Sequence, residues 1–185
     1  MNVQHAEEFA LGEPDAGAWL ELLFQEHYAR IVSMLIRLTG DRGQAEEIAA
    51  DVFCKLSRRS RLRRDDGGKT GWIYRVAMNA GLDALRSNAR RRRREEAAGA
   101  EDARAATSDD PLEGMVQRER RLQVRSVLGA MKPRDAQLLL LRASGLAYRE
   151  CADTLGIQPG SVGTLLARAE AEFERRYRAR YGENV

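Results

Sequence analysis

The sequence predicts an all-α protein made of two small helical domains joined by a flexible linker. Every segment with a clear hydrophobic period has the helical one, in which apolar residues recur every three or four positions. No run of strand length alternates between apolar and polar residues. Between residues 95 and 111 the chain turns to Ala, Glu, Gly, Asp, Ser and Thr without an apolar period, a composition that cannot support a core.

The 185 residues are expected to divide into four parts. These are an N-terminal tail (1–18), a first helical domain (19–94), the linker (95–111) and a second helical domain (112–182). A flexible linker of this length has a root-mean-square span of roughly 20–25 Å. We therefore expect two modules on a tether.

The first two helices of the first domain have recognisable ends. An apolar stripe runs from Leu20 to Leu38, and Gly40 after it suits the left-handed conformation of a helix C-cap. Asp41 is an expected N-cap for the next helix, with Gln44 three residues later as in a capping box. That second helix presents an acidic outer face, formed by Glu46, Glu47 and Asp51.

The third helix is expected to begin near Trp72, after a polar segment. The segment 58–70 contains Asp-Asp-Gly-Gly at 65–68, which is strong turn chemistry, so a mobile loop is expected. The helix ends in the arginine run 90–94. Its polar stripe has spacings of three or four residues and consists of Arg75, Asn79, Asp83, Arg86 and Arg90.

The second domain begins with two further helices. One helix passes through Met115, Val116, Leu122 and Leu128, and Pro133 opens the next, because proline needs no amide donor at a helix start.

The segment 145–168 then reads as a short helix, a tight turn and a second helix, the layout of a helix-turn-helix DNA reader. Gly156 can take the left-handed turn conformation, and Pro159 sits where the second helix starts. An apolar stripe leaves Ser161, Thr164 and Arg168 together on another face, where they can hydrogen-bond bases and phosphates. Any helical hairpin with a glycine turn gives the same pattern, so a purely structural interpretation stays open at this point.

Composition and motifs exclude several classes of function. With 32% charged and 43% hydrophobic residues the chain is typical of soluble globular proteins. No apolar run spans a bilayer and no secretion signal is evident, so a cytoplasmic location without membrane insertion is expected. Cys54 and Cys151 lie on expected apolar helix faces, and with two histidines no zinc-site spacing or catalytic triad stands out. We therefore expect that the protein is not an enzyme and that it has no catalytic residues, no bound metal and no cofactor.

Three stretches carry a resemblance to a known family. They are Leu-Thr-Gly-Asp-Arg at 38–42 with the helix through 53, Gly-Trp-Ile-Tyr-Arg-Val-Ala-Met-Asn at 71–79, and the helix-turn-helix behind them. In this order they resemble a bacterial RNA polymerase sigma factor of the extracytoplasmic-function type, over nearly the whole chain. The first domain is then similar to sigma region 2 and the second to sigma region 4.

The resemblance implies a role for each part of the chain. Core RNA polymerase would be bound by residues of the second helix: Glu46, Glu47, Asp51, Val52 and Phe53. The promoter −10 element would be recognised and melted by the third helix and the loop before it, and residues 63–70 would capture a flipped base. The residues implied for recognition and melting are Lys69, Trp72, Tyr74, Arg75, Asn79, Arg86 and Arg90. The −35 element would be read by Tyr148, Arg149, Ser161, Thr164 and Arg168. Core RNA polymerase, promoter DNA and an inhibitory anti-sigma factor are the implied partners.

The chain departs from the family pattern at five positions. Gly163, Leu165 and Glu170 stand where recognition helices of the family commonly carry lysine or arginine. Ala50 and Ser57 replace a usual glutamine and tryptophan on the polymerase-binding helix.

Two alternatives remain open from the sequence. One is a one-component helix-turn-helix transcriptional regulator, which would normally dimerise on a palindrome. The other is a basic helical adaptor that binds RNA or acidic proteins, with binding that ignores sequence and depends strongly on salt. The arginine-rich helix beside a glycine loop in the first domain argues against the regulator.

Overall fold

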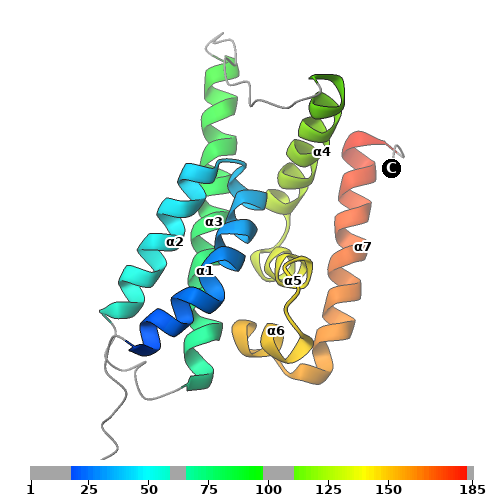
Figure 1. The fold of residues 1–185 in the computed structure, drawn as a ribbon. Coiled ribbons are helices and arrows are strands. Elements are labelled where there is room, and N and C mark those ends of the chain that lie inside the picture. Colours follow the sequence, from blue (N-terminus) through cyan, green and yellow to red (C-terminus); the bar gives the residue numbers. More distant parts are fainter. Residues whose placement is uncertain (1–17, 59–65, 98–110, 183–185) are drawn as a thin grey trace, which may run out of the picture.

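The computed structural model describes residues 18–58, 66–97 and 111–182 (Figure 1). Every regular element in these ranges is a helix, which confirms the all-α prediction. The elements in chain order are α1 (Ala18–Thr39), α2 (Arg42–Ser57), α3 (Asp66–Ala97), α4 (Pro111–Ala130), α5 (Pro133–Ala143), α6 (Tyr148–Leu155), the 3₁₀ turn η2 (Pro159–Ser161) and α7 (Val162–Tyr181). The expected tail and most of the expected linker lie outside the described residues.

Helix α3 runs along the molecule between two groups of helices. In Figure 1, α2 lies on one side of it, α1 crosses in front of it, and α4 to α7 lie on the other side. It contacts α1 and α2 of the first module and also α4 and α6 of the second. The two expected modules are therefore packed against each other along α3, an arrangement that a tether alone does not predict.

The turn between α1 and α2 forms where the sequence places it. Gly40 has a φ of +72°, and Asp41 caps α2 by accepting a hydrogen bond from the Gln44 amide at 2.9 Å. The capping box is not completed by Gln44, because the Asp41 amide donates to the Thr39 hydroxyl at 3.2 Å. The side-chain oxygen of Gln44 instead accepts from Asn88 of α3 at 3.0 Å, which fastens α2 to α3.

Helix α3 is longer than the sequence predicts at both ends. It begins at Asp66, so residues 66–70 are helical where a loop was expected. A glycine in a helix interior costs about 1 kcal/mol, but Gly67 and Gly68 lie in the first turn, whose amides have no intrahelical partner in any case. The packed apolar face that follows outweighs this local preference. At its other end α3 runs to Ala97, three residues beyond the expected domain boundary.

The first turns of α4 differ from expectation in their exposure. The helix forms as predicted, but Met115 and Val116 are 67% and 59% exposed and do not belong to the core. Only the second half of α4 is buried, through Val127 and Leu128.

The two modules share their hydrophobic core. The larger buried cluster joins Ile31, Leu35 and other residues of α1 to α3 with Leu138 and Leu141 of α5 and Cys151 of α6. A second cluster also joins the two modules, namely Leu38, Leu82 and Leu85 with Val127, Leu128, Met131, Ala136, Leu140, Ala169 and Tyr177. Apolar burial of this kind is the main favourable term in folding, so the modules stabilise each other.

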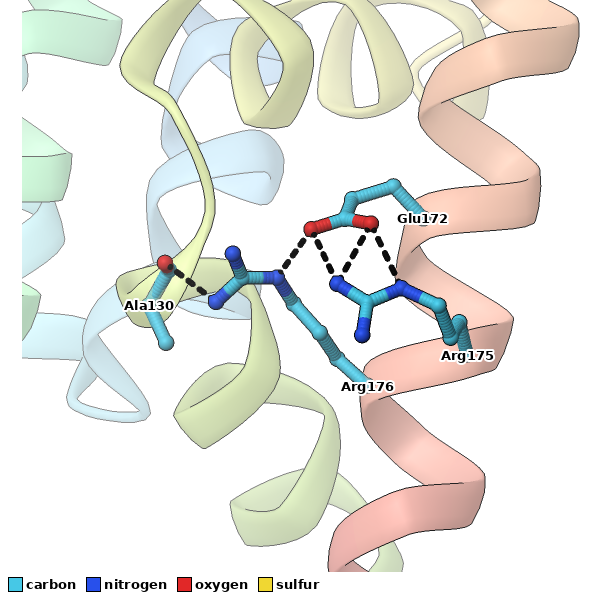
Figure 2. Close-up of polar contacts among 4 residues, drawn as sticks. All are labelled: Ala130, Glu172, Arg175 and Arg176. Carbon is cyan, nitrogen blue, oxygen red and sulfur yellow. Dashed lines mark hydrogen bonds and ion pairs between the residues drawn. The ribbon is translucent and has the colours of Figure 1, made fainter.

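A charged network fastens α7 to the end of α4. Arg176 donates to the carbonyl oxygen of Ala130 at 2.9 Å and to Glu172 at 2.5 Å, and Arg175 donates to both carboxylate oxygens of Glu172 (Figure 2). The last carbonyls of a helix lack intrahelical donors, so Arg176 supplies one to α4. The hydrogen bond from Arg176, followed in importance by those from Arg175, holds the pKa of Glu172 below its ordinary value.

The variant Glu172→Gln should lower the unfolding temperature at pH 7. Because the pKa of Glu172 is lower in the folded chain, its contribution to stability is present above the ordinary carboxyl range and is lost as the pH falls through the lowered pKa. The difference from the parent protein in thermal unfolding should therefore shrink in acid. Glu174→Gln is the matched control, because Glu174 pairs with Arg178 alone. A difference that persists unchanged at pH 3 would contradict this role of the charge.

Candidate functional site

The helix-turn-helix forms from α6, the turn after it and α7. Gly156 ends α6 with a φ of +65°, and the Ile157 amide donates to the carbonyl oxygen of Ala152 at 3.0 Å. This confirms the predicted left-handed turn. Pro159 opens η2 rather than α7 itself, which begins three residues later at Val162. A single 3₁₀ turn there brings α7 onto the buried side of α6.

The five residues expected to read duplex DNA are all exposed. Thr164 and Arg168 lie on the outer face of α7 and Ser161 lies directly before this helix, at the end of η2, whereas Val162 and Leu166 between them are buried. Arg149 is exposed at the start of α6. A side chain built on Gly163 would approach the Tyr148 ring at 3.7 Å, so the first turns of the two helices lie side by side. The structure thus leaves all five residues exposed and places Tyr148 beside the start of α7.

One further cation belongs to this surface. The guanidinium of Arg142, in the last turn of α5, lies 5.0 Å from the ring centre of Tyr148. Such a stacked arginine holds the aromatic ring and adds positive charge beside it. No sequence signal pointed to Arg142, because it lies outside the helix-turn-helix and six residues before Tyr148.

The polar stripe of α3 is occupied by the second module. Arg75 donates to the carbonyl oxygens of Thr154 at 2.6 Å and Asp153 at 3.3 Å, in the last turn of α6. The Asn79 side-chain oxygen accepts from Gln137 of α5 at 2.6 Å.

Arg86 of the same stripe lies within 3.5 Å of the Gly129 carbonyl oxygen, near the end of α4. Three of the residues expected to contact DNA therefore contact protein in this arrangement.

The two aromatic residues predicted for promoter opening are in different surroundings. Tyr74 has no exposed surface, and its hydroxyl lies 3.4 Å from Nδ1 of His27. Burial raises the pKa of Tyr74 and lowers the pKa of His27. Tyr74 is therefore a core residue and cannot stack on a base here, which corrects the expectation. Trp72 is partly buried and packs against the same core.

The base-capture segment is only partly described. Residues 63–65 lie outside the described residues, as does the side chain of Lys69, whose backbone is helical in α3. The expected role of Lys69 thus rests on the sequence alone. Farther along α3, Arg90 is exposed and belongs to the arginine run, in which Arg91 pairs with Glu95 at 3.7 Å.

The acidic face of α2 is exposed, but its expected apolar neighbours are not. Glu46 pairs with Arg42 at 2.8 Å, and Asp51 pairs with Lys55 at 2.6 Å, as i,i+4 pairs on the helix surface. Val52 and Phe53 are 1% and 6% exposed and belong to the core, so they cannot supply contact area as expected.

An exposed aromatic residue lies beside this face instead. Phe24 of α1 is 42% exposed and contacts the Phe53 ring edge-on, with 5.1 Å between ring centres. It also stacks on Tyr28 at 4.4 Å. The sequence pattern assigned Phe24 to the core stripe of α1, since its spacing with Tyr28 is four residues.

The remaining chemistry of the described residues is limited. Within residues 18–58, 66–97 and 111–182, no group of three or more His, Cys, Asp or Glu residues could hold a metal ion. Among the helices placed in the structure, none combines the length and apolar character needed to cross a bilayer. Cys151 is buried, which raises its thiol pKa, whereas Cys54 is exposed and not on an apolar face as expected.

Two family models match the chain. The model for sigma-70 region 2 matches residues 23–91, and the model for sigma-70 region 4 matches residues 121–173. Together they cover more than half of the chain. Their order agrees with the two modules described above.

The curated relatives carry sigma-factor names. The chain is 29% identical to "ECF RNA polymerase sigma factor SigE" of Mycolicibacterium smegmatis, over 91% of the chain and 64% of that protein. It is 30% identical to "Probable ECF RNA polymerase sigma factor SigI" of Mycobacterium tuberculosis, over 87% of the chain and 54% of that protein. It is 24% identical to "RNA polymerase sigma-H factor" of Pseudomonas aeruginosa, over 84% of each. The chain thus spans less than two thirds of the length of the first two of these relatives.

A larger side chain at Gly71 should separate the modules. A Cβ atom there would lie 3.4 Å from both the Asp153 carbonyl oxygen and the Thr154 Cα. Gly71→Ala fits at ordinary contact distance, but the longer side chain of Gly71→Gln would push α6 away from α3. We expect a larger radius of gyration by small-angle X-ray scattering for Gly71→Gln alone. Equal radii for the two variants would show that this contact does not control the arrangement.

Proposed function

Because the chain belongs to the sigma-70 family, in its extracytoplasmic-function type, we propose that it binds core RNA polymerase and directs it to promoter DNA to start transcription. The protein would contribute binding and strand separation, while the polymerase performs the chemistry. It would act in the cytoplasm, and an anti-sigma factor would be its inhibitory partner. These roles are inferred from relatives that are in part longer than this chain.

The exposed reading face of α6 and α7 is the observation that carries this proposal. Tyr148, Arg149, Ser161, Thr164 and Arg168 share one surface of a helix-turn-helix, where α7 can enter the major groove of the −35 element. Leu165 packs against the core, so the absence of a basic residue at this position does not remove a charge from the exposed surface.

We assign polymerase docking to α2 and its surroundings. Glu46, Glu47 and Asp51 would set the orientation of a helix-to-helix contact, and exposed Phe24 would supply apolar area. The buried pair Val52 and Phe53 would support the shape of this surface from below.

Promoter opening requires the polar face of α3, so the modules must separate before DNA binds there. Arg75, Asn79 and Arg86 would exchange their protein partners for the DNA backbone. Trp72, Arg90 and Lys69 are the other α3 residues proposed for this contact, Lys69 from the sequence alone. The domains would be residues 19–97 and 111–182. The intervening segment would then act as the tether, giving the second reader an effective concentration on the order of mM once the first is bound.

Run-off transcription with purified core RNA polymerase and promoter fragments tests the proposal directly. Specific transcripts that depend on this protein are expected. A protein that binds DNA as a dimer, yields no transcripts and does not comigrate with core polymerase would be a one-component regulator instead.

The variant Asp51→Arg should weaken binding to core polymerase by roughly tenfold or more, because it reverses a charge at the proposed contact. Glu26→Arg on α1 is the control, since it makes the same charge change at an exposed position outside α2. Fluorescence anisotropy with labelled protein measures both affinities. Equal affinity for the two variants would remove α2 from the docking surface.

The variant Arg168→Ala should weaken binding to −35 duplex by roughly 5- to 150-fold, since a side chain that contacts a base contributes about 1–3 kcal/mol. Arg178→Ala is the matched control, because Arg178 is on the same helix but pairs with Glu174. Affinity for core polymerase should not change. Equal loss of DNA affinity in both variants would mean that α7 contributes only general positive charge.

A further inference from the structure

A basic pocket lies where the two modules meet, at the far end from the helix-turn-helix. Its volume is about 580 Å³, within the range of small-molecule sites. Its walls come from the second half of α3, from α4 and from the end of α7. Six arginines line it, namely Arg86, Arg90, Arg92, Arg93, Arg125 and Arg180, and Glu119 is its one carboxylate.

These arginines have few anionic partners among the described residues. Arg86 has a long contact of 3.9 Å with exposed Asp83, and Glu119 accepts from Gln123. Arginines beside the pocket that do not line it are paired instead: Arg91 with Glu95, Arg178 with Glu174, and Arg175 with Glu172.

Arg125 forms the inner wall of the pocket. Its Nε donates to the Arg37 carbonyl oxygen at 3.1 Å, which ties α4 to the end of α1. Burial lowers its pKa, and the positive charges of Arg92 and Arg121 lower it further. Among the described residues, six arginines thus line the pocket with one carboxylate, and a bound anion would relieve the repulsion between them.

We propose that this pocket binds a small oligophosphate, a chain of two or more phosphoryl groups, either free or carried by a nucleotide. Guanidinium groups match phosphate oxygens as bidentate donors. Because these arginines come from three different helices, a chain of phosphoryl groups could pair with more of them than a single phosphate. The Tyr181 ring and Leu122 add an apolar wall beside the cations.

The ligand would hold the modules together. Arg92 and Arg93 belong to the first module, whereas Arg125 and Arg180 belong to the second, so the complete pocket exists only when the modules are packed. A ligand that binds one arrangement stabilises it in proportion to the logarithm of its concentration. The consequence for DNA binding rests on the proposed function: a bound oligophosphate opposes separation of the modules and therefore opposes binding of α3 to promoter DNA.

Isothermal titration of the full chain with inorganic tripolyphosphate tests the site. We expect one saturable site, weakened at least tenfold by Arg92→Ala with Arg180→Ala, which removes one arginine from each module. The control is Arg91→Ala with Arg178→Ala, which removes the same charge from the same two helices outside the pocket and should stay within threefold of the parent. No saturable binding, or equal weakening in both double variants, would overturn the proposal.

Two further measurements test the two-module site and its linkage to DNA binding. Gly71→Gln, once its larger radius of gyration has shown that the modules are open, should weaken tripolyphosphate binding, and unchanged affinity would overturn the two-module site. If the pocket binds the DNA backbone instead, Arg92→Ala with Arg180→Ala would weaken promoter binding in the absence of tripolyphosphate, and this result would also overturn the proposal.

Tripolyphosphate should reduce promoter binding by the parent protein but not by the double variant Arg92→Ala with Arg180→Ala. Intact tripolyphosphate binding without this effect would refute the linkage to DNA alone.

Discussion

The arrangement of this protein depends on arginines of the first module that donate to the last turns of helices in the second. Arg37 contacts the end of α5 through the Ala143 carbonyl oxygen at 2.6 Å, Arg75 contacts the end of α6, and Arg86 approaches the end of α4. Helix C-termini expose carbonyl groups without partners and carry partial negative charge, so arginine is well suited to them. Together with the shared apolar core, these contacts fix how α3 lies against the second module.

The same contacts set the cost of releasing α3. A hydrogen bond contributes only about 0.5–1.5 kcal/mol net, and one from a charged group about 1.5–3. A few such bonds can be exchanged for contacts with DNA phosphates of similar strength. The buried leucines between the modules are the larger obstacle, because DNA offers no equivalent apolar surface. The proposed open arrangement would thus differ from this one mainly in apolar burial, and binding partners that favour one arrangement would shift the balance.

The distribution of charge over the molecule agrees with the different roles proposed for its surfaces. The acidic surface is on α2, whereas arginines gather on α3, in the middle of α4, near the end of α7 and beside Tyr148. Where carboxylates accompany the arginines, as in the network of Glu172, the charges fasten helices to one another (Figure 2). Where carboxylates are scarce, as around Arg92, Arg125 and Arg180, the positive charge lines the pocket proposed to bind an oligophosphate.

Local physics in the sequence determined the helices, their caps at Gly40, Asp41 and Gly156, and the outward face of Ser161, Thr164 and Arg168. These features depend on period and on backbone preference over a few residues. Only the tertiary structure decided that Tyr74, Val52 and Phe53 are core, that Asp66 to Thr70 is helical, and that Arg75, Asn79 and Arg86 are occupied by protein. A polar stripe in a sequence predicts exposure of one helix face, but which partner covers that face depends on residues far away in the chain. Here those residues belong to the other module, 43 to 79 positions away.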